Sequence, residues 1–227
     1  MDRAAWLRER RASVEADYTR DASSYDEGYD PITVLHRRFV DRLIETTPEG
    51  GTLLDAPCGT GPYFGMILAA GRQVVGADQS AGMLERAGVK HPDVRLEHVG
   101  LQELAFEGAF DAAMCVDAME HVPPEEWPLV LTNLRRAIRP DAHLYLTVEQ
   151  VDRSSLARAF DKATAAGLPV VFGDRADDAT GGYHHYPSRK QVRRWLADAE
   201  LTLVEEGDEE LDGYGYHHLL VRAFDEV

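Results

Sequence analysis

The stretch LLDAPCGTG, residues 53–61, constrains the fold of this chain more than any other feature. A short apolar run ends in Asp55 and passes through Gly59 and Gly61 into a segment with helical spacing. Glycine lets the backbone approach a ligand closely, and the first turn of the following helix offers unpaired N–H groups. Ligands of open α/β sheets bind at the carboxyl ends of the strands. The stretch therefore predicts a βαβ unit with a ligand site at this turn.

Strand-like and helix-like segments alternate after this point, which predicts an α/β fold with a doubly wound, mostly parallel sheet. The seven predicted strands are Thr52–Asp55, Gln73–Ala77, Val94–His98, Asp111–Val116, Ala142–Val148, Leu201–Glu206 and Tyr214–Ala223. The helices predicted among them are Tyr63–Ala70, Ala81–Ala87, Glu125–Ile138, Arg153–Ala166 and Ser188–Ala199. The segment EGDEELDG before the last strand is short enough for a hairpin turn, so we expect the last strand to be antiparallel.

The length of 227 residues suits one domain with a sizeable core. We expect N-terminal helices and a tyrosine-rich flap in residues 1–48 and a ligand-binding core in residues 50–150. A lid follows the fifth strand in residues 150–187, and residues 188–227 form a helix and a strand pair. The N-terminal helices are predicted at Asp2–Asp17 and Thr33–Thr46.

Charge and cysteine content limit the partners. The 24 basic and 40 acidic residues give a formal charge of −16, which opposes binding to DNA and makes RNA a poor candidate. The amino terminus is charged from its second residue, and the apolar runs are too short for a membrane span. The two cysteines provide neither a disulfide framework nor zinc-ligand spacing. We therefore expect a cytoplasmic protein with a small-molecule partner.

A second acidic residue sharpens the ligand prediction. The strand QVVGAD ends in Asp78, where a carboxylate can accept both hydroxyls of a ribose. A dinucleotide-binding turn would carry a third glycine at position 64, which is Phe64 here. Asp55 would also repel a pyrophosphate. The two carboxylates therefore favour a ligand with both a ribose and a cationic group.

The motifs DAPCGTG and VVGADQSAGML resemble those of the class I S-adenosylmethionine-dependent methyltransferases. The resemblance is strongest over residues 50–150 and implies a Rossmann-like seven-stranded sheet with S-adenosyl-L-methionine as cofactor. In such a site, Asp55, Ala56, Pro57, Gly59 and Gly61 would hold the methionine part and Asp78 the ribose. The adenine would lie among Gln79, Met83, Leu101 and Gln102, and the remaining cofactor contacts would come from Asp117, Tyr18 and Tyr25. Two departures are Pro57, where the family usually has glycine, and Gly100, where many members have an acidic residue.

Methyl transfer from a sulfonium needs mainly positioning, and a base only when the acceptor must lose a proton. Histidine is the natural base near neutral pH. His121 and His184 are the candidates for this role, and Tyr183, His184 and His185 of the GGYHHYPS segment, with His121, are the candidate substrate contacts. The alternative is that His121 only packs or orients a loop and that the two adjacent histidines lie on the surface.

Asp117, Glu120 and His121 allow a further interpretation. The array is similar to the Glu-x-x-Glu-His array of metal-dependent ribose methyltransferases and ubiquinone-pathway O-methyltransferases, with His184 or His185 as an additional ligand. A divalent metal could then polarise a hydroxyl. We prefer the reading without metal, because Asp is shorter than Glu and no further ligand is assigned. The prediction is a small-molecule O-methyltransferase; the alternatives are a metal-assisted O-methyltransferase and a non-catalytic cofactor-binding sensor or scaffold.

Overall fold

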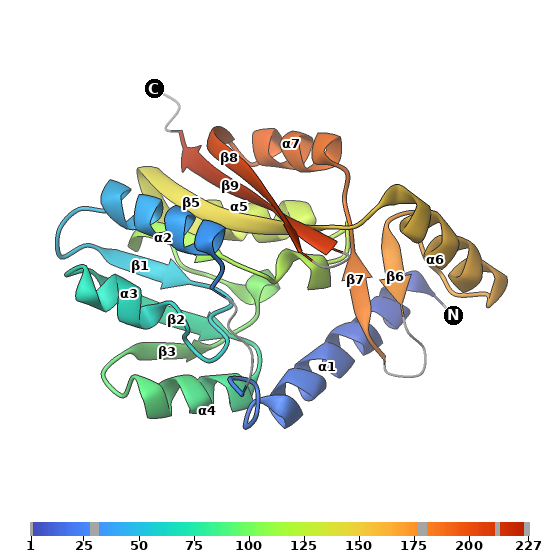
Figure 1. Ribbon diagram of the computed structural model, residues 1–227, viewed down its shortest axis with the longest axis horizontal. Helices are drawn as coiled ribbons and strands as arrows, with labels where there is room; N and C mark the ends of the chain where they lie inside the picture. Colours follow the sequence, from blue (N-terminus) through green and yellow to red (C-terminus); the bar gives the residue numbers. More distant parts are fainter. Residues whose placement is uncertain (1, 28–31, 177–180, 212–213, 225–227) are drawn as a thin grey trace.

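The computed structural model describes residues 2–27, 32–176, 181–211 and 214–224. Its main sheet has seven strands in the order β3-β2-β1-β4-β5-β9-β8 (Figure 1). The strands are β1 (Thr52–Asp55), β2 (Gln73–Asp78), β3 (Arg95–His98), β4 (Phe110–Cys115), β5 (Ile138–Gln150), β8 (Leu201–Leu211) and β9 (Tyr214–Ala223). Only β9 runs antiparallel to its neighbours β5 and β8. The predicted mostly parallel sheet with an antiparallel last strand is confirmed.

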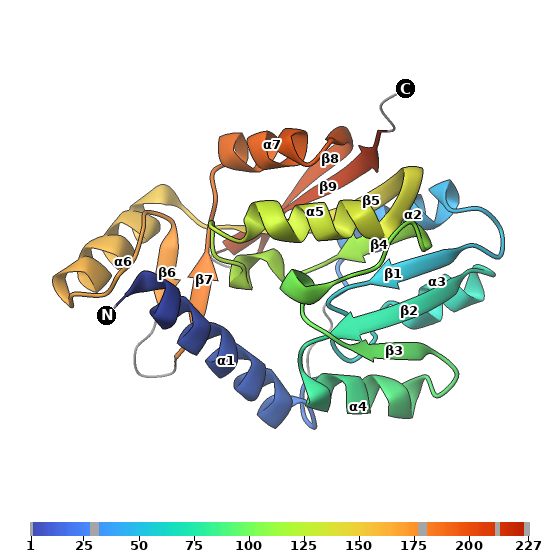
Figure 2. The ribbon, with the colours of Figure 1, turned by 180° about the vertical axis from the view of Figure 1, so that it is seen from behind.

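Helices cover both faces of the sheet, so the central strands are apolar on both sides, as expected for parallel strands. On one face, α2 (Val34–Thr46) and α3 (Phe64–Ala69) bury Phe39, Leu43 and Phe64. On the other, α5 (Trp127–Ala137) and α7 (Arg189–Asp198) bury Trp127, Leu134 and other apolar side chains (Figure 2). The helix α4 (Ala81–Lys90) packs against β2 and β3.

Three elements form a cover beside the carboxyl ends of the strands: α1 (Arg3–Asp21), α6 (Arg153–Ala165) and a small hairpin of β6 (Asp174–Ala176) with β7 (Tyr183–His185) (Figure 1). Asp174 joins them. Its fully buried carboxylate accepts hydrogen bonds from Arg3 of α1 at 2.7 Å and from the Tyr183 hydroxyl at 2.8 Å, and it pairs with His185 at 2.8 Å. The N-terminal helix is thereby tied to the segment predicted as a lid.

Several element boundaries differ from the prediction. The fifth strand begins at Ile138 rather than Ala142, and it accommodates Pro140 where its pairing with β4 shifts register, as proline in a strand requires. The acidic segment EGDEELDG is not a turn: most of it continues β8 to Leu211. Pairing with β9 up to Leu211 and Tyr214 holds the acidic run extended. Arg193 and Arg189 of α7 pair with its Glu206 and Asp208 and offset part of the negative charge.

The N-terminal and lid regions also contain more regular structure than predicted. Helix α1 continues to Asp21 and so includes the beginning of the predicted flap. The lid contains the β6–β7 hairpin in place of the predicted loop. Two short 3₁₀ turns complete the fold, η1 (Leu101–Glu103) and η2 (Met119–His121). Among the described residues, no helix has the length and apolar character needed to cross a membrane.

Candidate cofactor and substrate site

A cavity lies where β1, β2 and β4 end, and residues of α1 line part of it. Figure 2 shows α1 beside this edge of the sheet. The glycine turn forms one wall with Ala56, Pro57, Cys58, Gly59 and Thr60. The other walls include Asp78, Gln79, Met83, Leu101, Gln102, Asp117 and His121, and Arg11, Tyr18 and Tyr25 close the cavity from the N-terminal segment. Most of the residues predicted to contact a cofactor therefore lie around one space.

Asp78 is built into the glycine turn. Its Oδ2 accepts a hydrogen bond from the Gly59 N–H at 2.9 Å, and its Oδ1 accepts one from the Ser80 N–H at 2.8 Å. Gly59 has a φ of +51°, a conformation that favours glycine and that points its N–H at Asp78. Burial raises the pKa of Asp78. Because a carboxylate offers about four acceptor positions, each oxygen keeps capacity for a ligand hydroxyl.

Asp55 and Gly61, which were predicted to hold the methionine part, are not part of the cavity lining. Asp55 is 1% exposed, and its Oδ2 has no hydrogen-bond partner among the described residues. Burial, followed by the nearby charge of Asp78, raises the pKa of Asp55 well above its ordinary value. Two buried carboxylates this close favour a cationic group in the adjacent cavity, which would lower the cost of keeping them ionised.

The cavity also has apolar lining from Met83, Val99 and Leu101, and α1 contributes Arg11 and Val14 to its wall. The Arg11 Nε donates to Gln79 Oε1 at 3.1 Å, and its Nη1 donates to Glu103 at 2.8 Å. A side chain at Gly100 would overlap with the Arg11 guanidinium. The absence of a side chain at Gly100 thus makes room for Arg11. Gln102 lines the cavity, but its amide donates to Glu126 at 2.8 Å.

His121 faces the cavity with one nitrogen. Its Nδ1 must carry the proton, because the partner at 3.2 Å is the Tyr183 carbonyl, which can only accept. The Nε2 therefore accepts from the Tyr18 hydroxyl at 2.9 Å. Burial lowers the pKa of His121 to about 4. Near neutral pH the ring is uncharged and its lone pair is directed to the hydroxyl of a cavity-lining tyrosine.

The GGYHHYPS segment places its three predicted substrate residues differently. His184 lies beside His121, with ring centres 4.7 Å apart, and burial lowers the pKa of His184 to about 3. Tyr183 lines a smaller second cavity that shares Arg11, Val14 and His121 with the first. His185 is buried on the other side of β7, against Asp174, because successive side chains of a strand alternate.

The Asp117, Glu120 and His121 array does not have the arrangement of metal ligands in the described part of the chain. Asp117 Oδ1 accepts from the Thr147 hydroxyl at 3.0 Å and lies 3.1 Å from His36 Nε2. Both nitrogens of His121 are hydrogen-bonded to protein groups. Glu120 is 6% exposed, and burial raises its pKa well above the ordinary value.

Sequence reasoning missed Glu149, at the end of β5. Its side chain is 12% exposed, and Oε2 lies 3.5 Å from His184 Nδ1. Burial, followed by the charge of Asp117, raises the pKa of Glu149 to about 7. A carboxyl group that titrates near neutral pH is a candidate proton acceptor. The sequence signal was available, since Glu149 follows a predicted strand at its carboxyl end, next to the candidate site.

The strand order, the glycine turn and the acid that ends β2 define the class I methyltransferase architecture. The profile of the methyltransferase domain family matches residues 25–206, and the chain belongs to this family. The resemblance noted from DAPCGTG and VVGADQSAGML is thereby confirmed.

Relatives and solved structures agree with this assignment. The chain is 27% identical over 167 residues to the ubiquinone biosynthesis O-methyltransferase of Xanthomonas oryzae pv. oryzae, a match that covers 69% of this chain and 64% of that protein. It is 30% identical over 141 residues to the malonyl-[acyl-carrier protein] O-methyltransferase of Pectobacterium atrosepticum, covering 59% and 54%.

The fold is similar to that of the 1,6-didemethyltoxoflavin-N1-methyltransferase of Burkholderia thailandensis, with a TM-score of 0.70, 20% identity and coverage of 94% of this chain and 88% of that one. The magnesium protoporphyrin IX methyltransferase of Synechocystis PCC 6803 superposes with a TM-score of 0.68 at 18% identity, covering 94% and 99%.

Proposed function

We propose that the protein transfers the methyl group of S-adenosyl-L-methionine to an oxygen atom of a small molecule. The observation that carries the proposal is the acceptor at Asp78, which the glycine turn fixes in the wall of a cavity that also has apolar lining. Both first-described relatives are named O-methyltransferases. The whole activity remains a proposal, since the Xanthomonas match spans 64% of that protein.

The residues present fit the cofactor chemically. Asp78 has acceptor capacity for the two ribose hydroxyls, and Met83, Val99 and Leu101 offer apolar surface for an adenine ring. The buried carboxylate of Asp55 favours positive charge near the turn. When bound, the cofactor supplies an electrophilic methyl group on a sulfonium. The protein supplies alignment, which contributes roughly 7–11 kcal/mol in favourable cases.

His121 is our candidate to receive the proton of an acceptor hydroxyl. Its Nε2 lone pair is directed into the lined space, and the Tyr183 carbonyl holds the ring in the required tautomer. An acceptor hydroxyl that displaces the Tyr18 hydroxyl would meet this nitrogen. His184 packs against His121, with ring centres 4.7 Å apart, and its Nδ1 bonds the Tyr186 hydroxyl at 2.9 Å, so His184 supports the His121 ring and does not relay its proton.

Calorimetry tests the cofactor assignment. We expect S-adenosylmethionine and S-adenosylhomocysteine to bind with about micromolar affinity, near −8 kcal/mol, and NADH not to bind. Binding of NADH without binding of either sulfur ligand would contradict the assignment. Methyl transfer is then measured with a radiolabelled methyl donor and panels of phenols, carboxylic acids and amines. Tight binding without transfer to any acceptor would favour the sensor or scaffold alternative, and transfer only to amines would contradict O-methylation.

A further inference from the structure

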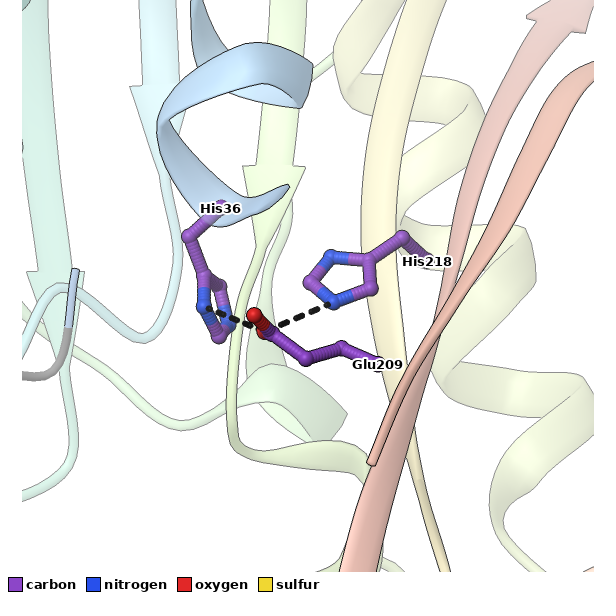
Figure 3. A group of neighbouring side chains, drawn as sticks. All are labelled: His36, Glu209 and His218. Atoms are coloured by element: carbon purple, nitrogen blue, oxygen red, sulfur yellow. Dashed lines mark ion pairs between the residues drawn. The ribbon is translucent and has the colours of Figure 1, made fainter. Parts of the chain in front are cut away.

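A second polar cluster lies behind the cavity, where α2 meets the last two strands. His36 comes from α2, Glu209 from β8 and His218 from β9, and the three side chains point toward one another (Figure 3). Glu209 Oε2 lies 3.8 Å from His36 Nδ1 and 3.7 Å from His218 Nε2. The two imidazoles are 1% and 0% exposed, and the carboxylate is 18% exposed.

These three side chains do not satisfy one another's hydrogen-bonding groups. His218 Nδ1 is 2.8 Å from the Tyr145 hydroxyl, whereas the buried Nε2 has no hydrogen-bond partner among the described residues. At 3.7 Å from Glu209, it is too far for a hydrogen bond. A buried nitrogen without a partner is costly unless a cation lies between it and the carboxylate.

Thr33 gives a second indication. Its single hydroxyl lies 2.5 Å from Glu209 Oε2 and 2.8 Å from His36 Nδ1. The Asp117 carboxylate can only accept, so the Nε2 of a neutral His36 ring carries the proton and Nδ1 presents its lone pair. One hydroxyl proton cannot serve this lone pair and the Glu209 carboxylate at once. His36 Nδ1 and Glu209 Oε2 therefore share one proton, and both lie close to His218 Nε2.

In both histidines, the ring nitrogen that faces away from the cluster is held by another protein group, as is common in metal-binding histidines. The Nε2 of His36 is 3.1 Å from Asp117 Oδ1, and that carboxylate is itself fixed by the Thr147 hydroxyl. Tyr145 holds His218 from the far side. In metal sites, the second ring nitrogen of a ligand histidine commonly bonds a carboxylate or another fixed group, which sets the tautomer and raises ligand basicity.

We propose that His36 Nδ1, Glu209 Oε2 and His218 Nε2 bind a divalent first-row transition metal ion such as Zn²⁺. Two imidazoles and one carboxylate are the donor set that such ions accept, with bonds of about 2.0–2.2 Å. The Glu209 oxygen lies 3.8 and 3.7 Å from the two nitrogens, and these separations need to contract only by a few tenths of an ångström around such an ion. All three atoms lie within 4.8 Å of one another. Partial exposure of Glu209 provides a path from solvent. Asp117 connects the ion to the cofactor cavity, which it also lines.

This site differs from the Asp117, Glu120 and His121 array, and its existence does not depend on the proposed methyl transfer. Loss of metal binding and loss of cofactor binding are separate measurements, so failure of one proposal is distinguishable from failure of the other. The experiment uses the full chain without an affinity tag of histidines, freed of metal by dialysis against a chelator.

Zn²⁺ is titrated by calorimetry and Co²⁺ by visible absorption. We expect the wild type to bind about one ion per chain. Under the same conditions, the conservative variants Glu209→Gln and His218→Gln should bind less than about a tenth of an ion per chain. Glu120→Gln is the matched control, because this buried carboxylate lies outside the cluster and should leave the stoichiometry unchanged. Asp117→Asn should weaken binding by about 10–100-fold, as expected for a group that orients a ligand.

Nitrogen NMR of the wild-type protein keeps the test independent of how the variants fold. Zn²⁺ should shift the ring nitrogens of two histidines and no others. The proposal would be overturned if the wild-type protein bound no stoichiometric ion, or if Glu209→Gln and His218→Gln bound the ion as the wild type does. Intense near-ultraviolet cobalt–thiolate bands would also overturn it, because they would place the ion on Cys58 or Cys115.

Discussion

His121 and Glu149 are two possible proton acceptors with very different acidities. The pKa of His121 is lowered to about 4 by burial, whereas that of Glu149 is raised to about 7 by burial and by Asp117. His121 lines the cavity, whereas Glu149 does not and lies 3.5 Å from His184 Nδ1. A base is half-ionised at its own pKa, so the pH dependence of turnover separates the two roles.

If His121 is the base, kcat should stay constant from pH 8 to pH 5 and fall below about pH 4. His121→Gln should lower kcat by about 10²–10⁴-fold while cofactor affinity changes little. Glu149→Gln serves as the comparison. An acidic limb centred near pH 7 that disappears in Glu149→Gln would transfer the role to the carboxyl group.

The raised pKa of Glu149 also predicts a stability change that needs no substrate. Its pKa rises from 4.5 to about 7 on folding, so between these values the folded chain retains a proton that the unfolded chain releases. Folding stability that depends on this group is therefore complete below pH 4.5 and is lost as the pH rises through 7. Relative to Glu149→Gln, the wild type should lose roughly 1–3 kcal/mol between pH 4.5 and pH 8 in urea unfolding. A constant difference would contradict the raised pKa.

Asp78→Ala tests the ribose contact. The substitution removes a charged acceptor for the ligand and the partner of the Gly59 and Ser80 N–H groups. We expect cofactor affinity to fall by roughly 1.5–3 kcal/mol, measured by calorimetry with S-adenosylhomocysteine. Asp93→Ala, on an exposed position after α4, is the control and should bind as the wild type does. Equal affinities for both variants would place the ribose elsewhere.

Helix α1 docks on α4 at a position where only glycine fits. A side chain at Gly82 would lie 2.5 Å from the Thr19 carbonyl oxygen and 3.0 Å from its Cα, both backbone atoms that cannot rotate away. The Thr19 hydroxyl lies 2.9 Å from that of Ser80 across the same contact. Because Tyr18 precedes Thr19 and lines the cavity, the contact between α1 and α4 also positions the Tyr18 side chain in the cavity wall.

Gly82→Ala should therefore push α1 away from α4. We expect a loss of about 1–3 kcal/mol from overpacking and weaker cofactor binding, together with faster proteolysis within α1. Gly88→Ala is a matched control in the same helix, where the nearest atom would be Leu96 Cδ1 at an ordinary 3.5 Å. It should be neutral or stabilise by up to about 1 kcal/mol. Equal behaviour of the two variants in urea unfolding and calorimetry would show that the α1–α4 contact is plastic.

Local sequence predicted the helices and strands wherever one segment's own pattern determined its structure. The strands Thr52–Asp55 and Tyr214–Ala223 have the predicted bounds, and the helix after Ser80 begins as expected because the Ser80 hydroxyl caps it. The acidic continuation of β8 was not predictable in this way, because it depends on pairing with β9 and on arginines of α7, which become neighbours only after folding. The β6–β7 hairpin likewise depends on Arg3, far away in the chain.

In the candidate sites, too, the residues that are close in the chain were predictable and those that only folding brings together were not. The glycine turn and Asp78 belong to one βαβ unit, so their spacing along the chain carries the information. His36, Glu209 and His218 come from a helix and two strands whose packing joins α2 to the last hairpin, and no spacing rule connects them. The side that His185 faces was equally hidden, since the prediction placed it in a loop without a partner strand.

Ligand binding should stabilise the whole molecule, because the cavity draws its walls from α1, the glycine turn, α4 and the end of β4. At a hundred times Kd, a ligand that binds only the folded chain adds about 2.7 kcal/mol. For a chain of this size we expect S-adenosylhomocysteine to raise the melting temperature by roughly 5–10 °C in calorimetric scans. NADH at the same concentration is the control, and an equal rise with both would contradict the cofactor assignment.

The N-terminal helix gives this fold a kinetic property. Arg11 spans from Gln79 to Glu103 over one end of the cavity, while Arg3 fastens the other end of α1 to Asp174. A ligand enclosed under α1 leaves only when α1 moves away from the cavity. The exchange of spent for fresh cofactor, rather than the chemical step, would then set the pace of repeated turnovers. Since the Arg11–Glu103 pair is partly exposed, added salt should shorten the residence time of the ligand.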